Sequence, residues 1–581
     1  MSNISKIKLE DITYDIKDLY ARNGSLNIRK FNTVALMKAA TDLTENTIII
    51  TAGFSSANDG GSATYILRAY GSGETANEVT TFACQNSMVA EILAQNEITT
   101  LQVGIIGDGS TDETTKLQSF FNYSSNKHVI NSNNILIDNN IIIPSNRNIV
   151  FAKGCKISRK TNGLDTYFMF NIVNKHDITI TNAHLVGDKD THTGNTGEWG
   201  YGINIAASRK IIIENALIEK TWGDGIYVGY SYSETNQYTT SYVTINKCII
   251  KDCSRNGISV CGGENIIVSN CVISGTDRVA PKSGIDIEPE GPDGYNFYLK
   301  NVQIENTTTE NNGESGICLG IATATANNVT ISGHKSYGEK HGVVCYSMGA
   351  NNSVEYRNGY IVKCNDAGLL ITKTQGSKFV IKNVVVDSTT KYDSAHGYNA
   401  ALVITTSSAN DGDLIVDNIE HIKSYSSLYE FADLICVRGS SGNVFSNLEL
   451  KNIYTTKYLS IPYTANVNLG NSVFEHSYTS SNDFNSFHNT NKIVASSQYA
   501  ADSLWDLYPS LADGEYTVIV SGNEAGNIVY VRPKNFTKVY DYSAGDISTN
   551  GIMLTSACTA YMKFKKVGNK LYYLERSGFH Q

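Results

Sequence analysis

Two acidic residues lie two places apart in the stretch Ser283–Glu290, which reads SGIDIEPE: these are Asp286 and Glu288. On a β-strand, residues i and i+2 point to the same face, with Cα atoms roughly 6 to 7 Å apart. Their carboxyl groups can then lie about 5 to 9.5 Å apart, the range used for cleaving glycosidic bonds. Two nearby carboxylates also raise each other's pKa, so one can be protonated while the other is ionised. The pair predicts a glycosidase-type site, with an ordinary solvated strand face as the alternative.

Two other acids stand close to this pattern. Asp224, in the stretch Trp-Gly-Asp-Gly at 222–225, is a candidate third acid that would orient water or a partner carboxylate. A simple turn residue is the alternative, because aspartate before glycine is common in turns. Glu290 follows Pro289 and is expected in the turn after the strand.

Aromatic and cationic side chains near these acids are candidates for binding a sugar. Trp199 and Trp222 each lie three places before a glycine, so we expect them to stack on adjacent coils as a platform for sugar rings. Packing at the edge of a turn is the alternative. Two tyrosines would form subsite walls, Tyr227 and Tyr346. Lys282 and His341 are near enough in register to bind an acidic sugar, and the alternative is that they are simply solvated.

One short phrase positions all of these residues. A glycine followed by an alternating apolar strand occurs seven times, at intervals of 23, 32, 27, 32, 26 and 26 residues: Gly202–Ile205, Gly225–Val228, Gly257–Val260, Gly284–Ile287, Gly316–Leu319, Gly342–Cys345 and Gly368–Ile371. Recurrence at such a period indicates a solenoid, and alternation with period two indicates that its unit is a strand. The sequence therefore predicts a parallel β-helix with an aliphatic interior.

Aligning the phrases on their glycine predicts which residues face outward. The residues two places after the glycine form the outward column: Asn204, Tyr227, Ser259, Asp286, Cys318 and Val344. Those four places after it form a second column: Ala206, Gly229, Cys261, Glu288, Gly320 and Tyr346. Only one coil has an acid in both columns. Its neighbours Gly229 and Gly320 lack side chains, so we expect an open groove beside the acidic pair.

Composition narrows the possible partners. Charged residues make up 18% of the chain and the net charge is −9, which argues against nucleic acid. The chain contains no run of about 18 apolar residues, so no membrane span is predicted. Residues 1–6 lack the apolar stretch of a secretory signal, so we expect synthesis and folding in a host cytoplasm. The 11 cysteines form no Cys-x-x-Cys pair and are expected to be reduced, buried thiols. No metal and no cofactor is expected.

Four segments are predicted along the chain. Residues 1–30 are a leader, 31–124 a small α/β collar with a capping helix, 125–494 the β-helix with its groove, and 495–581 a C-terminal antiparallel β-sandwich or barrel for trimerisation or glycan binding. The capping helix is expected over 114–123, with Ser110 or Thr111 as its N-cap. It would cover the open end of the solenoid.

The capping segment GDGSTDET at 107–114, followed by glycine-phrased repeats, resembles the pectate-lyase-like superfamily of right-handed β-helices. Over residues 31–460 it is most similar to phage tailspikes and capsule depolymerases, and the stretch Asp11–Arg22 resembles a segment near the start of phage tail proteins. The resemblance implies an all-β fold, a bacterial surface polysaccharide as substrate, a homotrimer, and attachment of the N-terminus to a phage tail or baseplate in the virion.

Three functions remain open from the sequence. The first is hydrolysis with Asp286 and Glu288 as acid and base or nucleophile. The second is a polysaccharide lyase or epimerase, which needs cationic groups or calcium to stabilise an anion; the outward columns show no Arg or Lys cluster for this. The third is a non-enzymatic adhesin of the same fold. A teichoic-acid backbone, with a phosphodiester bond to cleave, is also conceivable.

Overall fold

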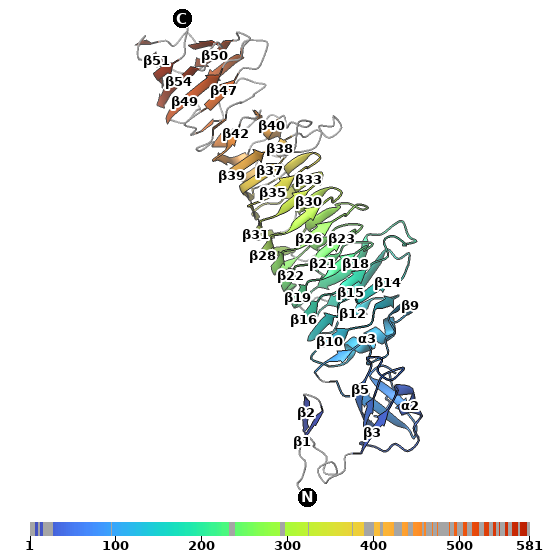
Figure 1. Cartoon of the computed structure of the whole chain (residues 1–581). Coiled ribbons are helices and arrows are strands. Elements are labelled where there is room, and N and C mark those ends of the chain that lie inside the picture. The colour runs from blue at the N-terminus through green and yellow to red at the C-terminus, as the bar shows by residue number, and fades with distance from the viewer. Residues whose placement is uncertain are drawn as a thin grey trace.

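The computed structural model describes residues 27–387, except residues 95, 232–238, 291–296, 323–324, 373 and 375. Outside that range it describes strands β1 (Lys6–Leu9) and β2 (Ile12–Asp15), strands β38 to β55, and residues 452–453. Apart from β2, the stretch Asp11–Arg22 lies outside the described residues. Figure 1 shows a long rod in which coils are stacked along one axis between an N-terminal module and a group of C-terminal strands.

The rod contains two long parallel sheets. One has twelve strands, one from each coil: β12 (Ile141–Ile142), β15 (Thr166–Val173), β18 (Trp199–Ala206), β21 (Ile226–Gly229), β24 (Ile258–Val260), β27 (Ser283–Ile287), β30 (Ser315–Ile321), β33 (His341–Met348), β36 (Ala367–Ile371), β38 (Ala400–Thr406), β40 (Asp433–Gly439) and β43 (Tyr458–Ser460). We call it the phrase sheet, because the glycine phrases lie in it. Its strands pair in parallel with the next coil throughout.

The second sheet takes up to two strands from each coil. One series of its strands runs β10 (His128–Ile130), β13 (Arg147–Phe151), β16 (His176–Thr181), β19 (Arg209–Glu214), β22 (Ser241–Asn246), β25 (Gly263–Ser269), β28 (Tyr298–Glu305), β31 (Thr325–Ser332), β34 (Ser353–Arg357), β37 (Lys378–Asp387), β39 (Asp411–Ile422), β41 (Phe445–Lys451), β44 (Val467–Asn468) and β46 (Phe487–His488). The other runs β11 (Asn134–Ile137), β14 (Lys156–Arg159), β17 (His184–Val186), β20 (Leu217–Glu219), β23 (Ile249–Lys251), β26 (Val272–Ser274), β29 (Thr308–Glu310), β32 (Lys335–Tyr337) and β35 (Tyr360–Val362).

The parallel stack begins earlier than the predicted residue 125. Strands β8 (Ile98–Thr99) and β9 (Asp108–Asp112) already pair in parallel with β10 and β11. The first rung therefore comes from residues assigned to the collar in the sequence analysis.

The predicted alignment of the phrases is confirmed by the strand register, with one exception. Each member of the outward column pairs with the next, from Asn204 through Tyr227, Ser259, Asp286 and Cys318 to Val344. The exception is a bulge in β33: Leu319 pairs with Cys345, but Gly320 pairs with Ser347. The second column therefore loses its register at Tyr346, since a bulge inserts an extra residue opposite one partner.

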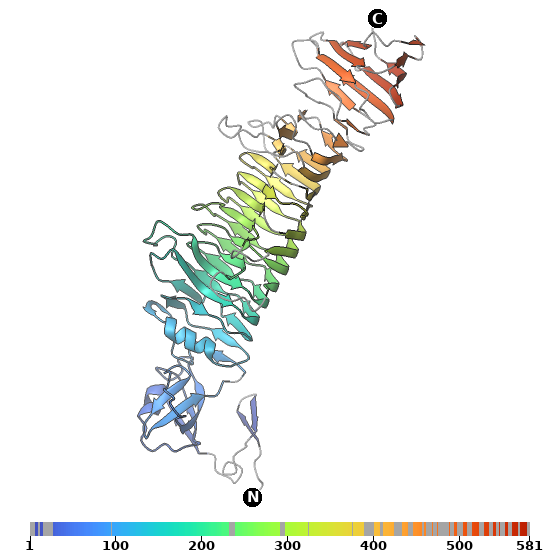
Figure 2. The ribbon, with the colours of Figure 1, turned by 180° about the vertical axis from the view of Figure 1, so that it is seen from behind.

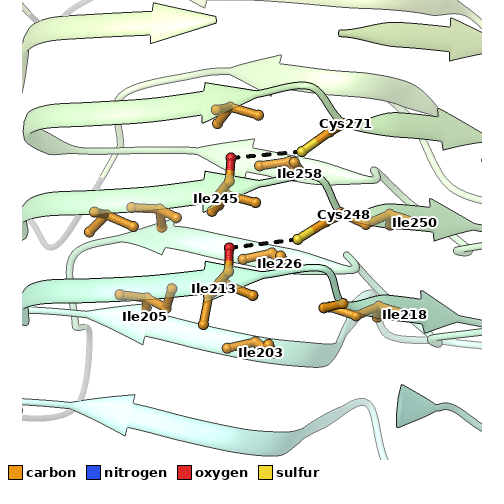
Figure 3. Close-up of a cluster of buried hydrophobic side chains, with 14 of the residues drawn as sticks. Ile203, Ile205, Ile213, Ile218, Ile226, Ile245, Cys248, Ile250, Ile258 and Cys271 are labelled. Atoms are coloured by element: carbon orange, nitrogen blue, oxygen red, sulfur yellow. Dashed lines mark hydrogen bonds between the residues drawn. The ribbon is translucent and has the colours of Figure 1, made fainter. Parts of the chain in front are cut away.

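The interior is a stack of isoleucines, shown in Figure 3, where Ile203, Ile226 and Ile258 lie above one another on successive coils. All three are fully buried. Full burial of one such side chain contributes about 1.5–3 kcal/mol, so the repeated column is a large part of what holds the coils together. The thiols of Cys248 and Cys271 continue the stack and donate to backbone carbonyl oxygens. Both are free and buried, as the sequence predicts.

The phrase glycines are required by close approach between coils. A Cβ added to Gly257 would lie 2.1 Å from Cγ2 of Ile273 and 2.7 Å from the carbonyl oxygen of Gly284. The same 2.7 Å approach to the next phrase glycine occurs at Gly202, Gly225, Gly284 and Gly316. The missing side chain of each glycine would therefore point into the interior, and the residue just before it points outward.

The N-terminal module is a five-stranded sheet with one short helix. Its strand order is β3 (Ile28–Phe31), β4 (Ile48–Thr51), β5 (Ala63–Ala69), β7 (Met88–Ile92) and β6 (Thr81–Cys84), and α2 (Val34–Ala39) packs beside it. The β3–β4 pair is parallel and the others are antiparallel.

The capping helix is α3 (Thr114–Asn122), which contacts β12 and, in Figure 2, lies across the N-terminal end of the stack. It buries Leu117, Phe120 and Phe121. The predicted capping by Ser110 or Thr111 is wrong, because both lie in β9, which extends to Asp112; the N-cap is Glu113.

The C-terminal strands form a mixed rather than an antiparallel arrangement. A six-stranded sheet has the order β47 (Ile493–Ser496), β49 (Gly514–Ser521), β54 (Ala560–Val567), β55 (Lys570–Ser577), β51 (Lys538–Asp541) and β52 (Gly545–Asp546). A three-stranded sheet contains β48 (Ser503–Leu507), β50 (Ile528–Pro533) and β53 (Ile552–Thr555), and a small pair is β42 (Tyr454–Thr455) with β45 (Val473–Phe474). The pairs β47–β49, β48–β50 and β51–β55 are parallel. Among the described residues no helix is long and apolar enough to cross a membrane.

Candidate active site

A cavity of about 540 Å³ lies on the outward side of β15, β18 and β21. This volume is within the range of sites that hold a small ligand. Its wall combines aromatic side chains with three charged ones: Phe168, Trp199, Tyr201, Tyr227, Tyr230, Glu198, Arg255 and Glu290. We refer to it below as the cavity.

Three rings of the aromatic wall follow the axis of the helix on successive coils. Phe168 and Tyr201 have ring centroids 5.5 Å apart, and Tyr201 and Tyr227 stack at 5.2 Å with an interplanar angle of 6°. Tyr201 and Tyr227 are largely buried in this stack. Trp199 is different: 45% of it is exposed, so its ring is available to a ligand. Trp199 and Tyr227, both predicted to contact a sugar, lie on this wall. Their role in sugar binding stays a prediction.

The charged end of the cavity is centred on Arg255. Its Nη1 donates to Oδ2 of Asp224 at 3.2 Å, and its Nε lies 3.4 Å from Oε2 of Glu198. Burial opposes the charge of Arg255, but the carboxyl groups of Asp224 and Asp286 outweigh it and raise the pKa of Arg255. The guanidinium is therefore permanently charged and held by carboxyl groups on two sides.

Asp224 lies beneath the cavity and has no exposed surface. Its carboxylate also accepts hydrogen bonds from the backbone N–H of Asn256 at 3.0 Å and from Oγ of Ser259 at 2.8 Å. The sequence predicts that Asp224 orients water or a partner carboxylate, or else is a simple turn residue. In the structure it is covered, and its hydrogen-bond partners are Arg255, Asn256 and Ser259. Burial raises the pKa of Asp224, and Arg255 opposes this rise. Its place in the site is to hold Arg255.

Asp286 points outward, as predicted, but is also fully buried. Nδ2 of Asn256 donates to its Oδ2 at 3.0 Å, while its Oδ1 has no hydrogen-bond partner among the described residues. Burial, and next the charge of Glu288, raise the pKa of Asp286 to about 8. The predicted open groove beside Asp286 is therefore wrong. Alternation along a strand fixes the direction of a side chain, and it does not fix what covers that side chain.

The two glutamates after Asp286 lie in different surroundings. A Cβ added at Gly320 would lie 3.3 Å from Oε1 of Glu288, so the Glu288 side chain fills the space that the glycine was expected to leave open. Glu290, which the sequence placed only in a turn, lines the cavity instead. Burial and the charge of Glu288 raise the pKa of Glu290.

Trp222 does not stack in line with Trp199. It is only 5% exposed, its ring stacks on His192 at 3.8 Å, and the guanidinium of Arg278 lies 3.5 Å from its centroid. Trp222 Nε1 donates to the carbonyl oxygen of Thr196 at 3.2 Å. The prediction of a sugar platform at Trp222 is wrong, because both faces of the ring are already covered.

Arg278 completes a clamp on the loop that leads into β18. Its Nη2 donates to the carbonyl oxygens of Gly197 and Trp222, at 2.9 and 3.0 Å. The neighbouring Asp277 pairs with Lys189 at 2.6 Å, on the same loop. Since Gly197 directly precedes Glu198, this clamp fixes where Glu198 enters the cavity.

The three remaining predicted contacts lie away from the cavity. His341 is 3% exposed, and its Nε2 lies 3.9 Å from Oδ2 of Asp366. Lys282 is partly buried against Gly313. Tyr346 is 47% exposed but sits in the bulge of β33. Alignment on the phrase glycines placed these residues near the acids in register; it did not measure how many coils separate them from the cavity.

The residues missed in the sequence analysis share one signal. Tyr201 and Asn256 occupy the place just before a phrase glycine, as Asp224 does, and Arg255 and Glu198 come one and three places earlier. The residue before the phrase glycine lies on the outward side, since Tyr201 lines the cavity, Asp224 bonds to Ser259 and Asn256 bonds to Asp286. Aligning the residues that directly precede the phrase glycines would have shown this cluster of polar side chains. Among the described residues no three or more His, Cys, Asp or Glu side chains are grouped so as to hold a metal ion.

Comparison with known proteins agrees with the fold. Residues 104–292 match a family model described as the right handed beta helix region. The parallel β-helix predicted from the repeats, and the right-handedness that the resemblance implies, are confirmed by this match together with the parallel sheets. Two Bacillus subtilis proteins are related over part of their length: YclG, an uncharacterized protein, is 33% identical over 30% of this chain and 32% of its own, and YorA, an SPbeta prophage-derived uncharacterized protein, is 31% identical over 29% and 31%. The match thus covers about a third of each relative.

Two solved structures illustrate the range of similar folds. The tailspike gp49 of Acinetobacter baumannii bacteriophage Fri1, a capsular polysaccharide depolymerase, is 12% identical over 78% of this chain and 75% of that one, with a TM-score of 0.43. The A-module of the Azotobacter vinelandii mannuronan C-5 epimerase AlgE6 is 13% identical over 68% and 98%, with a TM-score of 0.49. Identities this low say nothing about the reaction of this chain, which has to be argued from its own cavity.

Proposed function

We propose that this chain is a tailspike-type depolymerase that binds a bacterial surface polysaccharide in the cavity and hydrolyses a glycosidic bond there. The observation that carries this proposal is the combination of an aromatic wall with two carboxyl groups around Arg255 in one cavity. Aromatic side chains pack against the apolar faces of sugar rings, and a pair of carboxyl groups is what most glycoside hydrolases use.

The two carboxyl groups differ in environment, which suggests their roles. Burial and the charge of Glu288 raise the pKa of Glu290, which suits it to act as the proton donor. Glu198 lies beside the guanidinium of Arg255, whose Nε is 3.4 Å from its Oε2. Glu290 would give its proton to the oxygen of the leaving sugar. Glu198 would attack the anomeric carbon or take a proton from the attacking water.

Asp286 and Glu288, the pair proposed from the sequence, take a different place. Asp286 has no exposed surface and Glu288 lies over Gly320, so neither lines the cavity. Asp286 instead supports Asn256, which holds Asp224 below Arg255.

The state of Arg255 favours hydrolysis over a lyase. A lyase or epimerase needs a cation free to stabilise the anion formed beside a uronate carboxylate. Arg255 is the cation on the described cavity wall, and its guanidinium already contacts Asp224 and Glu198. The charge needed for that chemistry is therefore already neutralised.

The assembly is proposed from the resemblance to tailspikes. The chain would form a homotrimer, with residues 1–30 attaching it to a phage tail or baseplate. The relation to a prophage-derived protein over 29% of this chain supports a virion location.

Incubation with a panel of purified bacterial surface polymers tests the proposal, scored by chain length and by new reducing ends. We expect one polymer to be shortened by the native chain, and Glu290→Gln and Glu198→Gln each to lower the rate by at least about 100-fold. Glu355→Gln is the matched control, because this half-buried side chain lies on β34 and does not line the cavity. Asp286→Asn should retain most of the activity.

Each other result has a distinct meaning. Shortening that persists in both glutamine variants would reject the assigned residues. Unsaturated ends that absorb in the ultraviolet would show a lyase, and binding without shortening would show an adhesin.

A further inference from the structure

Carboxyl groups outnumber cations around the cavity. Glu198 and Glu290 line it, and Asp224, Asp286 and Glu288 lie behind its charged end. With Asp286 and the proton donor Glu290 uncharged, three carboxyl groups, those of Glu198, Asp224 and Glu288, remain near the place where a ligand would sit, against one cation on the described cavity wall, Arg255. The electric fields of like charges add together in a cavity whose walls have a low dielectric constant.

The cations in the same region are already engaged. Arg255 contacts Asp224 and Glu198. Arg278 lies against the ring of Trp222 and donates to two backbone carbonyl oxygens. Within the described part of the chain, the cavity wall thus offers a ligand no cation that lacks a carboxyl partner.

The stretches of sequence that directly follow two lining residues contain no lysine or arginine. Residues 232–238 follow the lining residue Ser231, and residues 291–296 follow Glu290. The two stretches contain one acid each, Glu234 and Asp293, and neither contains a lysine or an arginine.

The other lining groups suit uncharged sugar hydroxyl and amide groups. Asn171 and Asn204 lie on the wall and share a hydrogen bond of 2.8 Å, and Thr166 and Ser231 add hydroxyl groups. Amides and hydroxyls can both donate and accept, so they match a neutral ligand without a charged partner.

We infer that the cavity accepts sugar units that carry no negative charge, neutral or amino-bearing, and rejects units with a carboxylate or phosphate. This inference rests on the proposed function and names the substrate class of the same site. A carboxylate placed about 6 Å from one of these acids would meet a repulsion that weakens binding about tenfold or more. The polymer would be neutral or amino-bearing at the unit that occupies the cavity.

Matched pairs of polymers test this inference. Each acidic polysaccharide of the panel is compared with its carboxyl-reduced form, in which uronate carboxylates have become primary alcohols on the same backbone. We expect the reduced form to bind at least about tenfold more tightly at low ionic strength. Added salt should narrow this difference by screening the repulsion. Glu198→Gln should narrow it as well, because it removes a carboxylate from the cavity wall, and Glu355→Gln should leave it unchanged.

The inference fails if a native acidic polymer binds as tightly as its reduced form, or more tightly. If such a polymer is also shortened, the proposed function stands and only the charge selection is wrong. If no polymer, reduced or native, binds or is shortened, the proposed function is rejected and this inference with it.

Discussion

Replacing Arg255 by methionine should destabilise the coils around the cavity, because it leaves the buried carboxylate of Asp224 without its cation. The side chain of Arg255 is 10% exposed and that of Asp224 not at all. After the change Asp224 keeps two neutral donors, Asn256 N–H and Ser259 Oγ. Breaking a buried pair by removing one partner typically costs about 3–5 kcal/mol.

Protonation sets an upper limit to this cost. A carboxyl group with the ordinary pKa of 3.8 can be protonated at pH 7 for about 4 kcal/mol, at 1.4 kcal/mol per pH unit. In Arg255→Met the folded pKa of Asp224 rises further above its unfolded value, so ionisation opposes folding above pH 3.8. The loss of stability should therefore be about 3–4 kcal/mol at pH 7, shrink by about 1.4 kcal/mol per unit as the pH falls, and vanish near pH 4.

Native-state hydrogen exchange is the suitable measurement, because a solenoid unfolds locally as well as globally. The free energy of opening would be followed in β21 and β24, at pH 5 and pH 7. The double variant Arg255→Met with Asp224→Asn is the control, since it removes the charge as well as its partner, and it should recover most of the loss. A loss below about 1 kcal/mol at pH 7, or one that does not change with pH, would refute the account of the buried pair.

Three further predictions concern the frame around the cavity. Gly257→Ala should lower the free energy of unfolding by about 1–3 kcal/mol or more, because its Cβ would lie 2.1 Å from Ile273. Gly320→Ala should change it by no more than about 1 kcal/mol, and unfolding midpoints in urea compare the two variants. Arg278→Met should loosen the clamped loop and lower kcat on the shortened polymer more than it raises KM, while unchanged kinetics would deny it a positioning role. Asp286→Asn should stabilise the fold by a few kcal/mol at pH 8 and by nothing at pH 4. The reason is that a folded pKa of about 8 makes ionisation of Asp286 oppose folding only above the unfolded pKa of 3.8. An equal change in the free energy of unfolding at both pH values would contradict this.

The interior of the fold was predictable because it repeats. The apolar residues of each phrase alternate along the strand with a period of two. The recurrence of the phrase once per coil predicts which strands lie next to each other. The observed register from Asn204 to Val344 follows from that repetition. The parallel pairing of β8 and β9 was missed because those strands carry no phrase.

The site was less predictable, since it depends on contacts between residues far apart in the chain. Nothing local to Trp222 shows that its ring lies between His192 and Arg278, the latter 56 residues further along. The bulge at Tyr346 is a one-residue shift that alternation cannot detect. The burial of Asp286 depends on what covers the outward face, and a strand pattern is silent about that.

The cavity shows how a regular solenoid can carry a specific site. Along the interior, Ile203, Ile226 and Ile258 are fully buried and chemically identical. On the outward side of the same strands the residues change at every coil, from Asn204 to Tyr227 to Ser259. Since packing of the coils is decided on the inner side, the outer side is free to vary without changing the fold. The two acids proposed to act on the substrate, Glu198 and Glu290, are both residues that the phrase does not require.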